Sequence, residues 1–108
     1  MPASSEPPGK FTVDRLPLVT VQVHQLGNKA KSLGMTRQVL DAFEAILARL
    51  ETRPLEWGDP EYTTKHPGGL VLHGLYFPFI VHYVVYEQER IVCILDISVF
   101  PGHPLEGT

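Results

Sequence analysis

Apolar side chains recur at helical spacing through the middle of the chain. A stripe with intervals of three or four residues is formed by Val39, Phe43, Ile46 and Leu50, which is the spacing that places side chains on one face of an α-helix. The hydroxyl of Thr36 is suited to cap the start of this helix, and Pro54 disfavours helical geometry in the residue before it. The pattern predicts a helix from Thr36 to about Thr52.

The preceding segment, residues 17–33, fits two kinds of secondary structure. The three valines between Val19 and Val23 alternate with polar residues, as in a half-buried strand. A helical stripe is also present, formed by Val19, Val23, Leu26, Ala30 and Leu33. Pro17 suits the first position of a helix, and Gly34 suits the residue just after its end. The pattern alone leaves both strand and helix open for this segment.

The second half of the chain is rich in Val, Ile, Phe and Tyr, which are favoured in strands. Three strands are predicted, from Leu70 to Tyr76, from Phe79 to Tyr86 and from Ile91 to Phe100. Short connections, including a turn over residues 87–90, favour an antiparallel meander. A further short strand is predicted from Phe11 to Arg15, and the Pro- and Gly-containing stretch over residues 54–69 is predicted to be a loop.

A register for the meander follows from the turn positions. It places His73 opposite His82, His82 beside Leu95, and Tyr83 beside Ile94. One face then holds Val71, His73, Leu75, Ile80, His82, Val84, Cys93, Leu95 and Ile97. This face is mostly apolar and is expected to be covered by helices. The opposite face holds Leu72, Tyr76, Val81, Tyr83, Ile94, Asp96 and Ser98. It is mixed in character and is expected to be the open face, where a ligand or partner binds.

Length and composition fit one small globular domain. The 108 residues are 44% hydrophobic and 19% charged, which is a globular balance. Residues 1–10 and 101–108 contain several Pro and Gly and are expected to be tails, so the domain is expected over residues 11–100. No apolar run reaches the roughly 18 residues of a membrane span. With Cys93 as the single cysteine, no internal disulfide is possible. A cytoplasmic location is expected.

Charge narrows the range of partners. The formal net charge is −3, and the nine Lys and Arg form no run. Nucleic-acid binding depends on clustered cationic side chains that contact phosphates. Nucleic acid is therefore not expected as a strong direct partner, and no cofactor is expected.

Three short segments resemble the RelE/ParE toxin superfamily. The segment after the predicted second helix, residues 53–60, reads RPLEWGDP and is similar to the Pro and Gly-Asp step of these toxins. Residues 82–86, reading HYVVY, and the acidic turn and apolar strand over residues 87–95 are similar to their central hairpin. The resemblance implies an α+β fold in which a strand and an antiparallel helical hairpin pack on a small antiparallel sheet. It favours a helix for residues 17–33.

The resemblance implies one of two activities. The RelE branch implies cleavage of mRNA on the ribosome, and the ParE branch implies binding to DNA gyrase. RNA cleavage builds negative charge on phosphate oxygens and needs cationic groups directed at it. The position that matches the central-strand Arg of the family is Tyr83, and the last strand offers Asp96 and Ser98 but no Lys or Arg. We therefore expect ribonuclease activity to be weakened or lost.

Several side chains are candidates for a site. The binding candidates on the expected open face are Tyr76, Tyr83, Asp96 and Ser98. The weaker catalytic candidates, all able to exchange a proton, are Lys65, His66, Tyr76 and His103. His73 and His82 resemble cross-strand metal ligands, but without a third ligand we interpret them as hydrogen-bonded strand residues and expect no metal. Cys93 lies in an apolar run and is expected to be inert, and Trp57 is expected to anchor its loop on the core.

Three functional hypotheses follow. The first is a toxin-like protein that works by binding another protein, with an antitoxin segment as its expected partner. The second is an active ribosome-dependent endoribonuclease. The third is a homodimeric structural module, because the predicted strands are apolar on both faces and one pair of helices covers only one of them.

Overall fold

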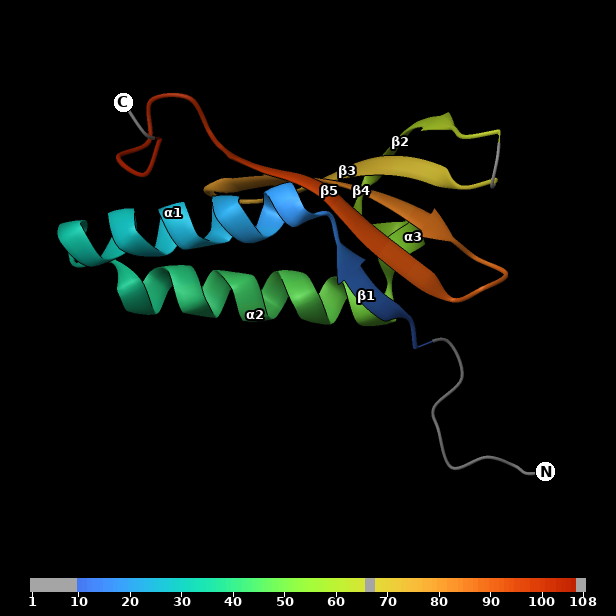
Figure 1. Cartoon of the computed structure of the whole chain (residues 1–108), viewed down its shortest axis with the longest axis horizontal. Helices are drawn as coiled ribbons and strands as arrows, with labels where there is room; N and C mark the ends of the chain where they lie inside the picture. The colour runs from blue at the N-terminus through green and yellow to red at the C-terminus, as the bar shows by residue number, and fades with distance from the viewer. Residues whose placement is uncertain (1–9, 66–67, 107–108) are drawn as a thin grey trace.

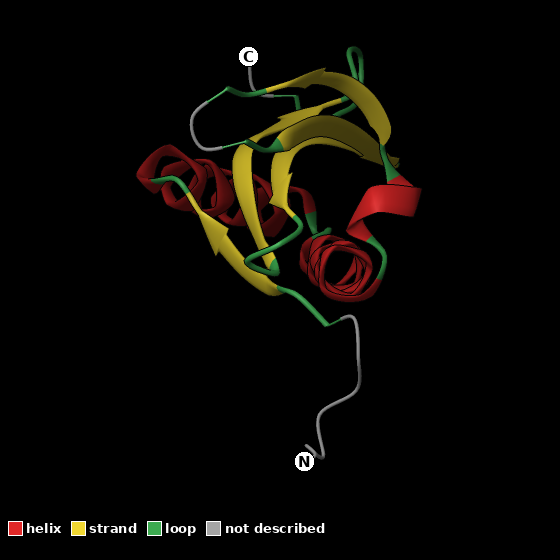
Figure 2. Ribbon diagram, turned by 90° about the vertical axis from the view of Figure 1, so that its right-hand side faces the viewer, coloured by secondary structure: helices red, strands yellow, loops and turns green. Residues whose placement is uncertain are grey.

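Helices and one sheet form two layers in the computed structural model, which describes residues 10–65 and 68–106. The elements in chain order are β1 (Thr12–Arg15), α1 (Pro17–Leu33), α2 (Thr36–Thr52), α3 (Pro54–Trp57), β2 (Asp59–Thr63), β3 (Leu70–Tyr76), β4 (Phe79–Tyr86) and β5 (Ile91–Val99). The five strands lie in the order β1-β5-β4-β3-β2. Both views show the α1–α2 hairpin on one side of the twisted sheet (Figure 1, Figure 2). The predicted α+β class and the helical hairpin packed on the sheet are confirmed.

The segment that was ambiguous in sequence is helical throughout. In α1, Val19, Leu26 and Ala30 are buried, whereas Val21 is 51% exposed. A strand would have put Val19 and Val21 on the same face, so their different burial follows the helical period. Gly34 ends the helix in the left-handed region with φ of 70°, a conformation that glycine adopts at little cost.

The start of α2 differs from the expectation. Thr36 is the first residue of the helix, Met35 occupies the cap position, and no side chain of Met35 or Thr36 caps the helix. The prediction that Thr36 is the cap is therefore wrong. The Met35 amide instead donates to the carbonyl of Ala30, at 2.8 Å, because the chain turns back on the end of α1. No helix among the described residues is long and apolar enough to span a membrane.

The sheet is mixed, and it has one strand more than predicted. β1 runs parallel to β5, from Thr12 opposite Ile91 to Arg15 opposite Ile94. Part of the predicted loop over residues 54–69 forms α3 and β2, and β2 pairs with the outer edge of β3. The chain beyond β5 also packs on the domain, because the side chain of Leu105 is only 2% exposed and belongs to the core.

The predicted register of the meander is correct at two of its three positions. His73 lies opposite His82, and Tyr83 lies opposite Ile94. His82, however, pairs with Asp96, because a bulge between His82 and Tyr83 leaves Leu95 as an extra residue in β5. A bulge changes which face each later side chain occupies. Asp96 therefore lies on the same face as His82.

The predicted assignment of the two sheet faces is inverted as far as Ile94, whereas beyond the bulge in β5 it is correct, with Ile97 in the core and Asp96 and Ser98 on the open face. The helices cover the face that holds Leu72, Val81, Tyr83, Val85, Val92, Ile94 and Ile97, all in the main core. The face that holds His73, His82 and Cys93 is the open one. The polar ring nitrogens of histidine stay in contact with water on a partly exposed face, which suits the two histidines to the open side. Tyr83 could be buried because its hydroxyl finds an acceptor in the core.

Candidate functional site

Five titratable side chains lie together on the open face, and β-bulges place two of them. The first bulge lies in β2 between Pro60 and Tyr62, so that Glu61 has no strand partner of its own. Its carboxylate reaches across β3 toward His73 and His82. The second bulge, in β5, places Asp96 beside His82. We call Asp59, Glu61, His73, His82 and Asp96 the histidine–carboxylate cluster.

Glu61 is the centre of the cluster. Its Oε2 atom lies 2.7 Å from Nδ1 of His73 and 3.4 Å from Nε2 of His82. The first pair is at hydrogen-bond distance but not in hydrogen-bond alignment, and Nδ1 of His73 has no hydrogen-bond partner. Outer carboxylates complete the row, with Asp59 Oδ2 3.8 Å from His73 Nε2 and Asp96 Oδ2 3.9 Å from His82 Nδ1. A shared carboxylate between two imidazoles can accept and return protons.

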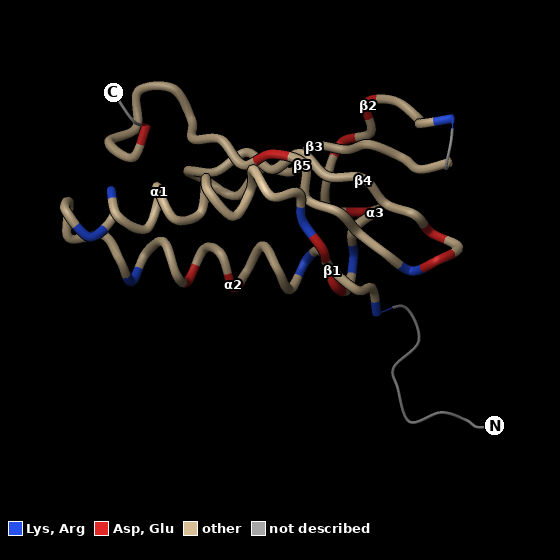
Figure 3. The backbone as a smooth tube through the Cα atoms, in the orientation of Figure 1, with Lys and Arg blue, Asp and Glu red and all other residues tan. Residues whose placement is uncertain are grey.

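Four members of the cluster are partly exposed, Asp59 is largely exposed, and the cluster contains no Lys or Arg. The side chains of Glu61, His73, His82 and Asp96 are 31–40% exposed. Figure 3 shows Lys and Arg scattered over β1, the helices and the turns. Within the described ranges, no group of His, Cys, Asp and Glu has a geometry that could hold a metal ion.

Gln22 on α1 locks the bulge in β5. Its Nε2 donates to Oδ1 of Asp96, at 2.8 Å, and its Oε1 accepts the amide of Ile97, at 2.9 Å. β1 stops at Arg15, opposite Ile94, so the edge of β5 beyond that point has no strand partner. The Gln22 amide takes the place of the missing strand. The hydrogen-bond partner of Asp96 therefore comes from a helix that is distant in the sequence.

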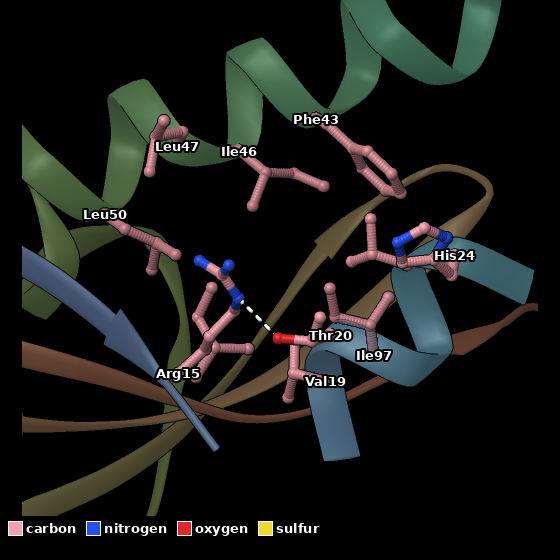
Figure 4. Close-up of a pocket in the computed structure, with 11 residues that line it drawn as sticks. Arg15, Val19, Thr20, His24, Phe43, Ile46, Leu47, Leu50 and Ile97 are labelled. Atoms are coloured by element: carbon pink, nitrogen blue, oxygen red, sulfur yellow. Dashed lines mark hydrogen bonds between the residues drawn. The ribbon is translucent and has the colours of Figure 1, made fainter. Parts of the chain in front are cut away.

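A second candidate site lies between the two helices. It is an open groove with a volume of about 380 Å³, a size typical of small-ligand and side-chain pockets. Its floor is formed by β5, and its walls by α1 and α2 (Figure 4). The lining residues are Arg15, Val19, Thr20, Val23, His24, Phe43, Ile46, Leu47, Leu50, Ile94 and Ile97. We call this the inter-helix groove.

Arg15 supplies the only formal charge in the groove, because none of the described residues that line it is Asp or Glu. Arg15 ends β1, and Thr20 lies in the first turn of α1, so the short connection brings them together. The Arg15 Nε donates to the Thr20 hydroxyl, at 2.9 Å. This bond fixes the guanidinium at one end of the groove, while His24 lies near Phe43 at the other (Figure 4).

Tyr83 does not lie on the open face. Its side chain is 0% exposed, and its hydroxyl donates to the carbonyl of Pro54, at 2.6 Å. Its ring stacks on that of Trp57, with centroids 5.7 Å apart, and Trp57 also covers Gly74. The predicted anchoring by Trp57 is confirmed. Burial raises the pKa of Tyr83 to about 12, which keeps the phenol neutral.

The other predicted site residues are dispersed. Tyr76 and His103 line a recess beside α2, with the Arg49 guanidinium 5.0 Å from the centre of the Tyr76 ring. Lys65 is in the turn after β2, and His66 lies outside the described residues. Ser98 lies opposite Ile80, toward the end of β5. Only Asp96 of the predicted binding residues belongs to the histidine–carboxylate cluster.

Cys93 is half-buried on the open face, opposite Val84. Burial, with a smaller contribution from Asp14 in β1, raises the pKa of its thiol. A raised pKa leaves less thiolate at neutral pH, and the thiolate is the reactive form. The environment agrees with the expectation of an inert cysteine.

Sequence reasoning missed Glu61, Asp59 and Gln22. Two of them fall in the predicted loop, where Pro60 hides the strand pattern, and Gln22 is an ordinary polar residue on a helix. The pairing of His73 with His82 was the one available signal for the cluster. Comparison of the chain with protein-family models, with curated proteins and with solved structures found no match.

Proposed function

We propose that this chain is a small toxin-like protein that acts by binding another protein, with ribonuclease activity weakened or lost. The observation that carries the proposal is the inter-helix groove. Its lining is almost wholly apolar, and it is open to solvent at the surface of the helical hairpin. Open apolar grooves between helices are the kind of site into which a partner inserts apolar side chains from a helix or extended segment.

The rim of the groove has the exposed apolar surface that such a partner requires. Leu47 lines the groove and is 44% exposed. Covering this side chain removes apolar area from water, which stabilises the complex by about 25 cal/mol for each Å² buried. The proposed occupant of the groove is the target protein, and an antitoxin segment, the partner that the RelE/ParE resemblance implies, is proposed to compete for the same groove. The cytoplasm is the proposed location, since Cys93 is a free thiol.

The charges on the open face support weakened ribonuclease activity. Asp59, Glu61 and Asp96 surround His73 and His82. Carboxylates repel the phosphodiester groups of RNA, and the charge that develops during cleavage needs cationic donors. The histidine–carboxylate cluster has no guanidinium or ammonium group to supply them.

Regulated expression in a bacterial host tests the proposal. Growth and mRNA ends, mapped by primer extension, are followed in the same cultures. We expect growth arrest without new mRNA ends. Leu47→Gln should relieve the arrest, because it places an amide on the groove rim. Leu40→Gln is the matched control, since Leu40 is on the same helix, is 54% exposed and does not line the groove. Normal growth with the wild-type chain, or equal effects of the two substitutions, would contradict the proposal.

A second candidate function is acid–base cleavage of RNA, and the position of Glu61 between two imidazoles favours it. In that reaction Glu61 would take the proton from a ribose 2′-hydroxyl while the 2′-oxygen forms its bond to phosphorus. His82, on the other side of Glu61, would act as the general acid that gives a proton to the departing 5′-oxygen. This assignment replaces Lys65, His66, Tyr76 and His103, of which the described members lie outside the cluster.

The same primer-extension experiment separates the two functions. If new mRNA ends appear, Glu61→Gln should abolish them and His103→Gln should leave them unchanged, because His103 packs against Phe77 away from the cluster. That pattern would establish the second function and overturn the first. New ends that survive Glu61→Gln would contradict cleavage at the cluster.

A further inference from the structure

The guanidinium of Arg15 is an unpaired charge at an apolar surface. Within the described part of the chain no carboxylate forms an ion pair with it, and its side-chain hydrogen bond is to the neutral Thr20 hydroxyl. Arg15 is an exposed residue whose side chain lines the apolar groove, so a ligand that binds there excludes water from one side of the charge. Attraction to an anion is stronger where water is partly excluded. The groove therefore favours a ligand that has a negative charge at one end.

The orientation of the guanidinium suits a carboxylate. Thr20 occupies Nε, and Figure 4 shows the two terminal nitrogens directed into the groove, toward Leu50 and Ile46. Two parallel N–H groups of one guanidinium match the two oxygens of a carboxylate. The hydrogen bond from Arg15 Nε to the Thr20 hydroxyl reduces the freedom of the Arg15 side chain before the ligand arrives, which lowers the entropic cost of binding.

The remaining part of the groove suits an aliphatic chain. Along α2 the wall runs from Phe43 to Leu50, which is about 10 Å at the rise of an α-helix. Across from it, Val19 and Val23 on α1 and Ile97 on the sheet present only apolar atoms of their side chains. A short aromatic acid would leave much of this length unfilled. A medium-length alkyl chain fills it.

We propose that the inter-helix groove binds an aliphatic monocarboxylate of medium chain length, with its carboxylate on Arg15 and its tail toward Phe43. The proposal deepens the proposed function by giving the same groove a small ligand that competes with the partner segment. It rests on the proposed function only for that competition. Binding of the ligand itself needs no partner and can be measured with the purified chain.

Titration calorimetry with the purified full chain tests the assignment, with octanoate, octan-1-ol and octylammonium as probes of equal length. Octanoate should bind at least about tenfold more tightly than octan-1-ol, as is typical of a hydrogen bond to a charged group. Octylammonium should bind most weakly, since Arg15 repels it. Changes in amide NMR shifts should concentrate at Val23, Ile94 and Ile97. Equal binding of octanoate and octan-1-ol, or no binding of octanoate, would overturn the proposal.

Substitutions identify the charge responsible. Arg15→Gln should remove the preference for octanoate over octan-1-ol, and Thr20→Val should reduce it, because the guanidinium is then less fixed. Arg37→Gln is the matched control, since Arg37 is an exposed residue of α2 outside the groove. A preference that survives Arg15→Gln, in a variant with an unchanged circular dichroism spectrum, would overturn the assignment.

The two proposals fail separately. If Leu47→Gln relieves growth arrest but octanoate does not bind, the protein-binding function stands and the carboxylate site is wrong. If octanoate binds with the expected preference but the wild-type chain leaves growth unchanged, the carboxylate site stands and the toxin-like function is wrong.

Discussion

Removing the hydroxyl of Tyr83 should destabilise the protein and should not alter a binding surface. In the wild-type chain this hydroxyl donates to the carbonyl of Pro54, at 2.6 Å, and both residues are buried. Tyr83→Phe keeps the ring and its stacking on Trp57 but leaves the carbonyl without this donor. An unsatisfied buried acceptor costs about 1–3 kcal/mol. We therefore expect the free energy of unfolding to fall by about 1–3 kcal/mol.

Chemical and thermal denaturation measure this change. For a domain of this size each kcal/mol should lower the Tm by about 4–8 °C, so a shift of several degrees is expected. Tyr62→Phe is the matched control, because Tyr62 is 59% exposed in β2. Its unfolding free energy should change by less than about 0.5 kcal/mol, so its Tm should stay within about 2 °C of the wild-type value. The urea m-value should be unchanged in both variants.

The same substitution has a pH signature with a defined sign. Burial raises the folded-state pKa of Tyr83 to about 12, above the ordinary value of 10.0 for a tyrosine phenol. The folded state holds the phenolic proton more tightly than the unfolded state, so its stability contribution is complete below pH 10 and is lost as pH rises toward 12. A difference of two pKa units between the folded and unfolded states corresponds to a contribution of about 3 kcal/mol to the unfolding free energy.

Tyr83→Phe should remove this loss, because Phe has no proton to release. The difference in unfolding free energy between wild type and variant should therefore shrink between pH 9.5 and pH 11.5, measured by urea denaturation at each pH, where roughly one to two kcal/mol of the contribution develops. Parallel curves for the two proteins across this range would refute the reasoning. So would an unchanged Tm for Tyr83→Phe at neutral pH, since both results would mean that the phenol is not buried against Pro54.

Three further predictions concern the packing and the assembly. Gly74→Ala should lower the unfolding free energy by about 1–3 kcal/mol, because the new Cβ would lie 2.6 Å from the Trp57 ring. Gly27→Ala should raise it by up to about 1 kcal/mol, because Gly27 is in a helix and its Cβ would meet nothing within 4 Å. Identical thermal melting curves for the two variants would contradict the packing. Gln22→Ala should speed hydrogen exchange at the Ile97 amide by at least about tenfold, since that amide loses its acceptor; protection equal to wild type would show that another group serves as acceptor. Size-exclusion chromatography with light scattering should give a monomer at micromolar concentration, because the open face has a charged cluster and not a continuous apolar surface; a stable dimer would instead support the homodimeric module.

Local patterns in the sequence were sufficient for the secondary structure of α2 and of the meander, whereas they left strand and helix open for α1. The apolar stripe of α2 and the limits set by Pro17 and Gly34 depend on residues that are close in the chain, so neighbours alone determine them. The pairing of His73 with His82 was predictable for the same reason, because a short turn fixes the register of the hairpin. These features needed no knowledge of the remaining structure.

Only the tertiary structure decided which sheet face is covered and which residues meet there. Both faces of the strands are largely apolar, so the alternation of side chains could not select the side for the helices. The bulges at Glu61 and Leu95 leave no signature in the hydrophobic pattern, yet they place Glu61 and Asp96 beside the histidines. The bond from Gln22 to Asp96 joins residues 74 positions apart. Such contacts arise from the packing of distant segments, which no local pattern records.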